Sequence, residues 1–157
     1  MLTRILPYLG VMAALTGMAH ACPHCHDEKD PVKVTLVVIL ASEEGNTIDL
    51  RLKAIAQEVQ KLNPNLKRFA LKHMENKSLK PGEKVSLPLV ESRKIDMVIK
   101  HGADKDNRVS LCVAIPNMGE IEYQTVCGKF LPIVTRCKTK AGDRLILAIR
   151  VQPCRGD

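Results

Sequence analysis

The chain has 157 residues, with 24 lysines and arginines against 17 aspartates and glutamates, a net charge of +7, and no tryptophan. A chain of this length is long enough to bury a single hydrophobic core. Its cations are spread along the sequence, and beyond residue 21 the only aromatic residues are Phe69, Tyr123 and Phe130. Nucleic-acid binding needs a basic patch with stacking rings, so the composition argues against a nucleic-acid partner.

Residues 1–21 have the pattern of a secretory signal peptide. Arg4 precedes an apolar run that ends at Leu15, and small residues lead to Ala19-His20-Ala21, an A-x-A cleavage site. The apolar run is short and interrupted, so we expect no transmembrane span in the mature chain. The protein is expected to be exported to the periplasm or outside the cell. A cysteine at the first mature position, Cys22, leaves lipoprotein anchoring as an alternative.

An oxidising compartment favours disulfides, and the chain has an even number of cysteines, six in all. Their spacing divides the mature chain into a Cys/His-rich segment at residues 22–31 and a single β-rich domain at residues 32–157. The cysteines of the domain are Cys112, Cys127, Cys137 and Cys154.

The domain begins with residues 32–41, "VKVTLVVILA", an almost continuous aliphatic run that predicts a central strand buried on both faces. An amphipathic helix is predicted next, capped by Asn46 and ended by Asn63-Pro64. Its apolar face is formed by residues at helical spacing, namely Leu52, Ile55, Ala56, Val59 and Leu62. We expect this helix to cover a sheet.

From residue 66 the hydrophobic period changes to two, which predicts short strands between turn signals. The expected strands are residues 66–73, 84–90, 94–101, 108–115, 119–126, 129–137 and 144–153. The predicted fold class is therefore α+β, a predominantly antiparallel β-sheet or sandwich of about seven to eight strands with one helix after the first strand.

Residues 102–107 resemble the start of a calcium loop. The glycine that such a loop requires after its first ligands is missing, and an apolar run occupies the position of its bidentate glutamate. We interpret them as a hairpin turn. His73 and His101 have no ligand partner at a useful spacing, so both are interpreted as structural histidines.

The last two strands predict a disulfide. If residues 139–142, "TKAG", form a four-residue hairpin loop, antiparallel pairing sets Cys127 directly opposite Cys154. Opposed residues on neighbouring strands lie close enough for a disulfide. We therefore expect a Cys127–Cys154 bridge, which leaves Cys112 and Cys137 to pair with each other.

The stretch Cys22-Pro23-His24-Cys25-His26 allows several interpretations. Cys22-x-x-Cys25-His26 resembles the haem attachment motif of c-type cytochromes, which implies thioether bonds to covalently attached haem c and His26 as axial ligand. Met74, Met97 and Met118 are candidates for the sixth ligand by residue type. Apolar packing is the simpler explanation for these methionines.

The tetrapeptide Cys22-Pro23-His24-Cys25 resembles the active-site motif of periplasmic disulfide oxidases. The strand before that motif and the helix after it are missing from the sequence pattern. A third interpretation makes Cys22, His24, Cys25 and His26 soft ligands for copper or another metal ion. In the fourth, the segment is a tail whose two cysteines bridge each other or pair with the domain.

The domain itself shows no nucleophile with an adjacent base, paired carboxylates or phosphate loop. The expected function is a non-enzymatic, disulfide-stabilised binding or structural module of the bacterial cell envelope, without a cofactor. Its expected partner is an envelope protein or an anionic surface. The alternative is a haem-carrying electron-transfer protein that uses the Cys22-x-x-Cys25-His26 motif.

Overall fold

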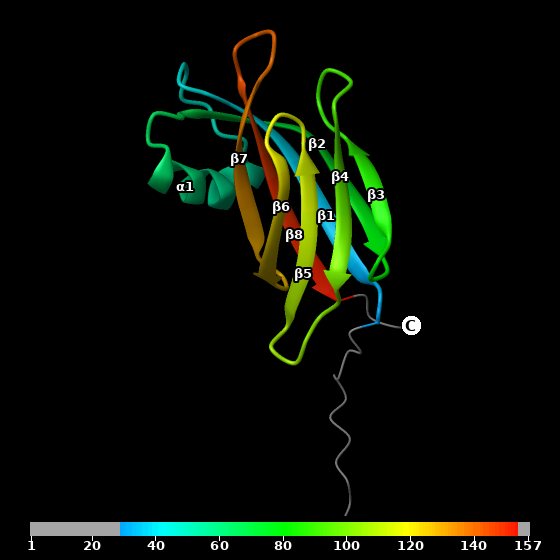
Figure 1. The fold of residues 1–157 in the computed structure, drawn as a ribbon. Coiled ribbons are helices and arrows are strands. Elements are labelled where there is room, and N and C mark those ends of the chain that lie inside the picture. The colour runs from blue at the N-terminus through cyan, green and yellow to red at the C-terminus, as the bar shows by residue number, and fades with distance from the viewer. Residues whose placement is uncertain (1–28, 154–157) are drawn as a thin grey trace, which may run out of the picture.

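The computed structural model describes residues 29–153 and shows eight strands in two antiparallel sheets, with one helix after the first strand (Figure 1). The predicted fold class is confirmed. Sheet A contains, in spatial order, β2 (Arg68–Leu79), β1 (Val32–Ser42), β8 (Arg144–Pro153) and β7 (Phe130–Lys138). Sheet B contains β3 (Lys84–Pro88), β4 (Lys94–His101), β5 (Arg108–Ile115) and β6 (Gly119–Val126).

β1 occupies the centre of sheet A, as its continuous apolar run predicts. Its alternate side chains are buried on opposite faces: Leu36 and Val38 contribute to the core between the two sheets, whereas Val37 and Ile39 pack beneath the helix. The strand pairs antiparallel with β2 on one side and with β8 on the other. A strand covered on both faces favours apolar residues at successive positions, which explains the loss of alternation from Leu36 to Ile39.

The molecule therefore has three layers and two apolar clusters. The larger cluster fills the space between sheets A and B, and the smaller one joins sheet A to the helix α1 (Lys53–Leu62). In Figure 1, α1 lies beside β7, on the side of sheet A that faces away from sheet B.

The helix starts later than predicted, and its cap is Asp49 rather than Asn46. A 3-10 turn, η1 (Leu50–Leu52), leads into α1, and the Asp49 carboxylate accepts a hydrogen bond from the Arg51 backbone N–H. The residues before Asp49 are held in extended pairing with β2, since Phe69 exchanges backbone hydrogen bonds with Thr47 and Asp49. That pairing keeps the chain out of helical geometry until residue 50.

The β7–β8 hairpin also differs from the prediction. Its loop consists of the five residues 139–143 between the paired Lys138 and Arg144, and the Thr139 backbone N–H donates to the Asp143 carbonyl within it. The register then shifts between Val134 and Lys138. Thr135 holds this bulge: its hydroxyl donates to the Leu145 carbonyl at 2.7 Å and accepts the Cys137 N–H at 3.1 Å.

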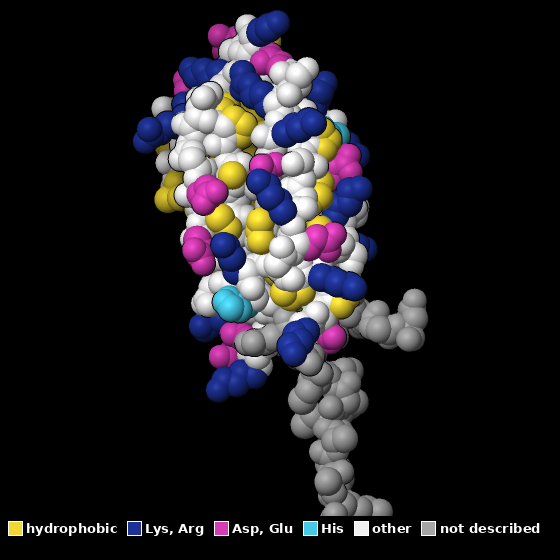
Figure 2. All heavy atoms as spheres, turned by 45° about the vertical axis from the view of Figure 1, so that its right-hand side comes forward, with side chains coloured by type: hydrophobic (Ala, Val, Ile, Leu, Met, Phe, Trp, Pro, Cys, Tyr) yellow, Lys and Arg dark blue, Asp and Glu magenta, His cyan; other side chains and the backbone are white. Residues whose placement is uncertain are grey.

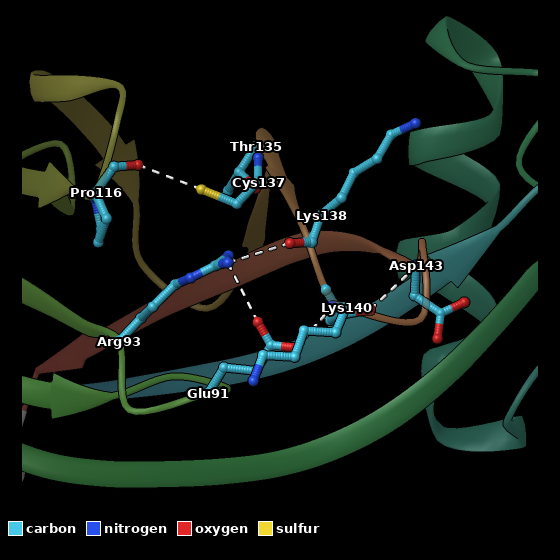
Figure 3. Close-up of polar contacts among 9 residues, drawn as sticks. Glu91, Arg93, Pro116, Thr135, Cys137, Lys138, Lys140 and Asp143 are labelled. Atoms are coloured by element: carbon cyan, nitrogen blue, oxygen red, sulfur yellow. Dashed lines mark hydrogen bonds and ion pairs between the residues drawn. The ribbon is translucent and has the colours of Figure 1, made fainter.

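Two loops from different sheets are joined at the hairpin end of the sandwich (Figure 3). In the turn between β3 and β4, Glu91 and Ser92 both have positive φ. The Glu91 carboxylate accepts the Lys140 backbone N–H at 2.7 Å, and the Arg93 guanidinium donates to the Lys138 carbonyl at 3.2 Å. The β3–β4 turn thereby holds the β7–β8 hairpin.

The predicted hairpin turn at residues 102–107 is confirmed between β4 and β5. Asp104 uses its carboxylate within the turn, where one oxygen accepts the backbone N–H groups of Asp106 and Arg108. His73 links the two sheets at another edge, because its Nε2 lies 2.9 Å from the Pro88 carbonyl oxygen.

Candidate functional site

The N-terminal candidates Cys22, His24, Cys25 and His26 lie outside the described residues. The methionines considered as sixth haem ligands lie in different surroundings. Met97 is fully buried and Met118 partly buried in the core between the sheets, whereas Met74 is 46% exposed on β2. The packing of Met97 between the two sheets makes it a core residue rather than a ligand.

Cys112 and Cys137 are free thiols in the structure, so the predicted bridge between them is not formed. Cys137 lies in the core between the sheets, and its Sγ donates to the Pro116 carbonyl at 3.3 Å. Cys112 follows Leu111, which points into that core, so strand alternation turns Cys112 to the outer face of sheet B. Its Sγ lies 4.0 Å from a Glu120 carboxylate oxygen. Sheet B separates the two thiols.

The Cys127–Cys154 bridge stays a prediction, because Cys154 lies outside the described residues. The alignment from which it was inferred is wrong by one residue, because Phe130 pairs with Arg150 rather than with Val151. Cys127 lies beside the end of β8, since the next residue, Gly128, donates its N–H to the Val151 carbonyl at 2.8 Å. Burial raises the pKa of the Cys127 thiol, and the nearby Asp104 carboxylate raises it further. The neutral thiol is therefore favoured in the reduced protein.

A groove of about 740 Å³ runs between α1 and the edge strand β7. Its apolar lining comes from both elements and consists of Ala54, Ile55, Leu62, Phe130, Leu131 and Pro132. Leu62 is 84% exposed, although its spacing predicted a place on the buried face of the helix. It is the last residue of α1, whose buried residues are Ile55, Ala56 and Val59.

The strand β7 presents an unusual apolar edge beside this groove. Its first five residues, Phe130 to Val134, are all apolar and all partly exposed. Pro132 lies in the middle of the run and has no backbone N–H, which is tolerated on an edge strand. A proline within an apolar run is the sequence signal that marks β7 as an edge strand.

Positive charge adjoins the same groove. Lys129 is one of its lining residues, and the Arg150 guanidinium lies over the Phe130 ring, 4.7 Å from the ring centroid. The Nε atom of Arg150 is buried without a hydrogen-bond partner among the described residues. The groove's carboxylate, Glu58, is already paired with Lys61 at 2.6 Å. The net charge around the groove is therefore positive.

A second, polar pocket of about 290 Å³ lies next to the β7–β8 hairpin. Arg68 and Asp143 form an ion pair of 2.5 Å in its wall, and Lys138, Arg144, Glu43 and Glu44 add both signs of charge. The mixed charges give this pocket no net preference for an anion or a cation. The outer surface over β3 and β4 is similar, with basic and acidic side chains interspersed (Figure 2).

Within residues 29–153, no three His, Cys, Asp or Glu side chains form a group that could hold a metal ion. None of the described helices is long and apolar enough to cross a bilayer. The carboxylates with clearly shifted pKa values, Asp49 and Asp96, both form hydrogen bonds at the protein surface. Hydrogen bonds from Arg51 lower the pKa of Asp49, and those from Ser86 and Lys84 lower the pKa of Asp96.

The candidate site is therefore the groove between α1 and β7, an apolar surface with a positively charged border. Comparison with known proteins adds no assignment, because no family model, no curated protein and no solved structure matches the chain.

Proposed function

We propose that this protein is an exported, non-enzymatic binding module of the bacterial cell envelope, with the α1–β7 groove as its binding surface. The signal-like residues 1–21 support export. The sandwich supplies a rigid base, because α1 and β7 are both fixed to the apolar cluster on the outer face of sheet A.

The observation that carries the proposal is the exposure of Leu62 and the first half of β7 around one groove. Leu62 is 84% exposed, and Phe130, Leu131 and Pro132 are only partly buried. Contiguous exposed apolar surface bordered by polar residues is typical of a binding site, because covering it removes apolar area from water. The shifted carboxylates Asp49 and Asp96 lie in surface contacts away from this groove, which favours binding over catalysis.

Site-specific photo-crosslinking in a bacterial host tests this function. A photoreactive phenylalanine analogue at position 62 is compared with the same residue at position 50, since Leu50 is 88% exposed and is not among the groove residues. We expect adducts from the envelope fraction at position 62 that are absent at position 50. The same adducts at both positions would contradict a binding groove, and retention of the protein in the cytoplasm would contradict export.

A second candidate function, haem-based electron transfer, depends on the Cys22-x-x-Cys25-His26 motif. It is tested by expressing the chain with c-type haem assembly and recording its visible spectrum and intact mass. A Soret band and the added mass of one haem, both lost in a Cys25→Ser variant, would establish it. A colourless protein would reject it, and peptide mass mapping of the same sample would show whether Cys127 is bonded to Cys154.

A further inference from the structure

The chemistry of the groove restricts what it binds. Its walls are the side chains of one helix and one edge strand, and the apolar lining residues include Leu62, Phe130 and Pro132. A bound peptide would bring a polar backbone N–H and C=O with every residue, and each buried group needs a hydrogen-bond partner. An alkyl chain has no such requirement.

Pro132 also favours an alkyl chain over a peptide, because of its position on the edge strand β7. Peptides that add to a sheet pair with the free backbone groups of its edge strand. Pro132 lies at the centre of the β7 segment that lines the groove and cannot donate a hydrogen bond. Prolines in edge strands occupy positions whose N–H would point away from the sheet, so Pro132 interrupts the row of donors that an added strand would use. This favours a ligand held by its hydrocarbon surface.

The charges next to the groove indicate the sign of the ligand's polar end. Lys129 precedes Phe130 in the sequence and lines the groove. The Arg150 guanidinium is stacked on the Phe130 ring. Neither cation forms an ion pair with a carboxylate of the described residues. Arg150 also retains a buried Nε without an acceptor. A carboxylate at this end would pair with Lys129, which lines the groove, and would be attracted by the neighbouring Arg150 guanidinium over Phe130.

We propose that the α1–β7 groove binds an alkyl carboxylate, with the hydrocarbon chain against Leu62, Phe130 and Pro132 and the carboxylate facing Lys129 and Arg150. This inference rests on the proposed binding function and specifies its ligand as a fatty acid. A volume of about 740 Å³ lies within the range of small-molecule sites.

Calorimetric titration with decanoate tests the proposal, with 1-decanol as the neutral ligand of equal chain length. Leu62→Gln is compared with Leu50→Gln, because both positions are more than four-fifths exposed and only Leu62 lines the groove. We expect Leu62→Gln to weaken decanoate binding about fivefold or more, and Leu50→Gln to leave it within about twofold. Both variants should keep the stability of the parent protein.

The carboxylate contact is tested separately. Lys129→Gln should weaken decanoate binding and leave decanol binding unchanged, whereas Lys72→Gln, an exposed change on β2, should affect neither. Absence of decanoate binding, or equal loss in Leu62→Gln and Leu50→Gln, would overturn the proposal.

Crosslinking separates failure of this inference from failure of the proposed function. Protein adducts specific to position 62, in a chain that does not bind decanoate, would show that the groove binds a protein instead and would reject only the fatty acid. Failure of both experiments would reject the groove as a binding site altogether.

Discussion

Thr135 stabilises the irregular part of the β7–β8 pairing through a buried hydroxyl, which bonds to both the Leu145 carbonyl and the Cys137 N–H. Replacing Thr135 with valine keeps the shape and leaves both backbone groups without this partner. We expect Thr135→Val to lower the free energy of unfolding by about 1 to 3 kcal/mol, measured by urea denaturation. Thr47→Val, at an exposed position, is the control and should be nearly neutral. Equal stability of both variants would contradict a structural role for this hydroxyl.

Asp49 provides a pH-dependent helix cap. Its carboxylate accepts hydrogen bonds from the Arg51 side chain and backbone, which lower the pKa of Asp49 in the folded protein. A lowered folded-state pKa gives stability that is present above the unfolded-state value of about 3.9 and is lost as the pH falls through the folded-state value. Asp49→Asn keeps a capping oxygen but loses the charge.

The wild-type protein should therefore be more stable than Asp49→Asn at pH 7, with a difference that shrinks below about pH 4. Urea denaturation of both proteins across this range measures the difference. A difference that stays constant with pH would show that the charge of Asp49 does not contribute to the cap.

At the level of elements, the helical segment formed by η1 and α1 contributes to stability at its start and to the groove at its end. Leu52 is 1% exposed in the cluster under the helix, whereas Leu62 is 84% exposed. We expect Leu52→Ala to lower the free energy of unfolding by about 2 to 5 kcal/mol, because it leaves a cavity. Leu62→Ala should change it by no more than about 0.5 kcal/mol. Denaturant titrations test both, and a large loss in Leu62→Ala would contradict its assignment to the binding surface.

The strand β7 shows how an element can be predicted while its environment is not. Residues 129–137 were predicted as a strand, and β7 spans Phe130–Lys138. The apolar residues at its start are by themselves compatible with a strand buried on both faces or with an exposed edge, and Pro132 favours the edge. In the tertiary structure β7 is the last strand of sheet A and has β8 as its neighbour in that sheet.

At the level of the whole molecule, the β3–β4 turn holds two layers together but carries conformational strain. Glu91 and Ser92 have φ of 55° and 61°, a region that favours glycine. Ser92→Gly should raise the free energy of unfolding by roughly 0.5 to 1 kcal/mol, because relief of strain outweighs the entropy lost on folding.

Glu91→Gly relieves similar strain but removes the carboxylate that binds the Lys140 N–H and pairs with Arg93. We therefore expect it to be less stable than Ser92→Gly in parallel thermal and urea unfolding. Equal stability of the two glycine variants would show that the contact between the β3–β4 turn and the β7–β8 hairpin contributes nothing measurable.

Local pattern was sufficient to predict the class of fold and most of the strands, although β2 continues to Leu79, beyond the predicted residues 66–73. Four predicted strands, residues 94–101, 108–115, 119–126 and 144–153, have the observed bounds. Alternation of apolar side chains and the turn residues between the runs are local properties, so they can be recognised without knowing which strands pair. The single helix and the central position of β1 follow from the same kind of local pattern.

Pairing between distant segments determined the helix cap, the hairpin register and the separation of the cysteines, which the local sequence pattern did not predict. Phe69 holds residues 47–49 extended and moves the helix cap from Asn46 to Asp49, and the bulge at Thr135 changes the hairpin register. Strand alternation within two different sheets separates Cys112 from Cys137. The sequence alone determined where strands and helix form, because those preferences act between neighbouring residues. Only the tertiary structure decided which side chains meet and that Leu62 borders a groove, because these depend on how distant segments pack.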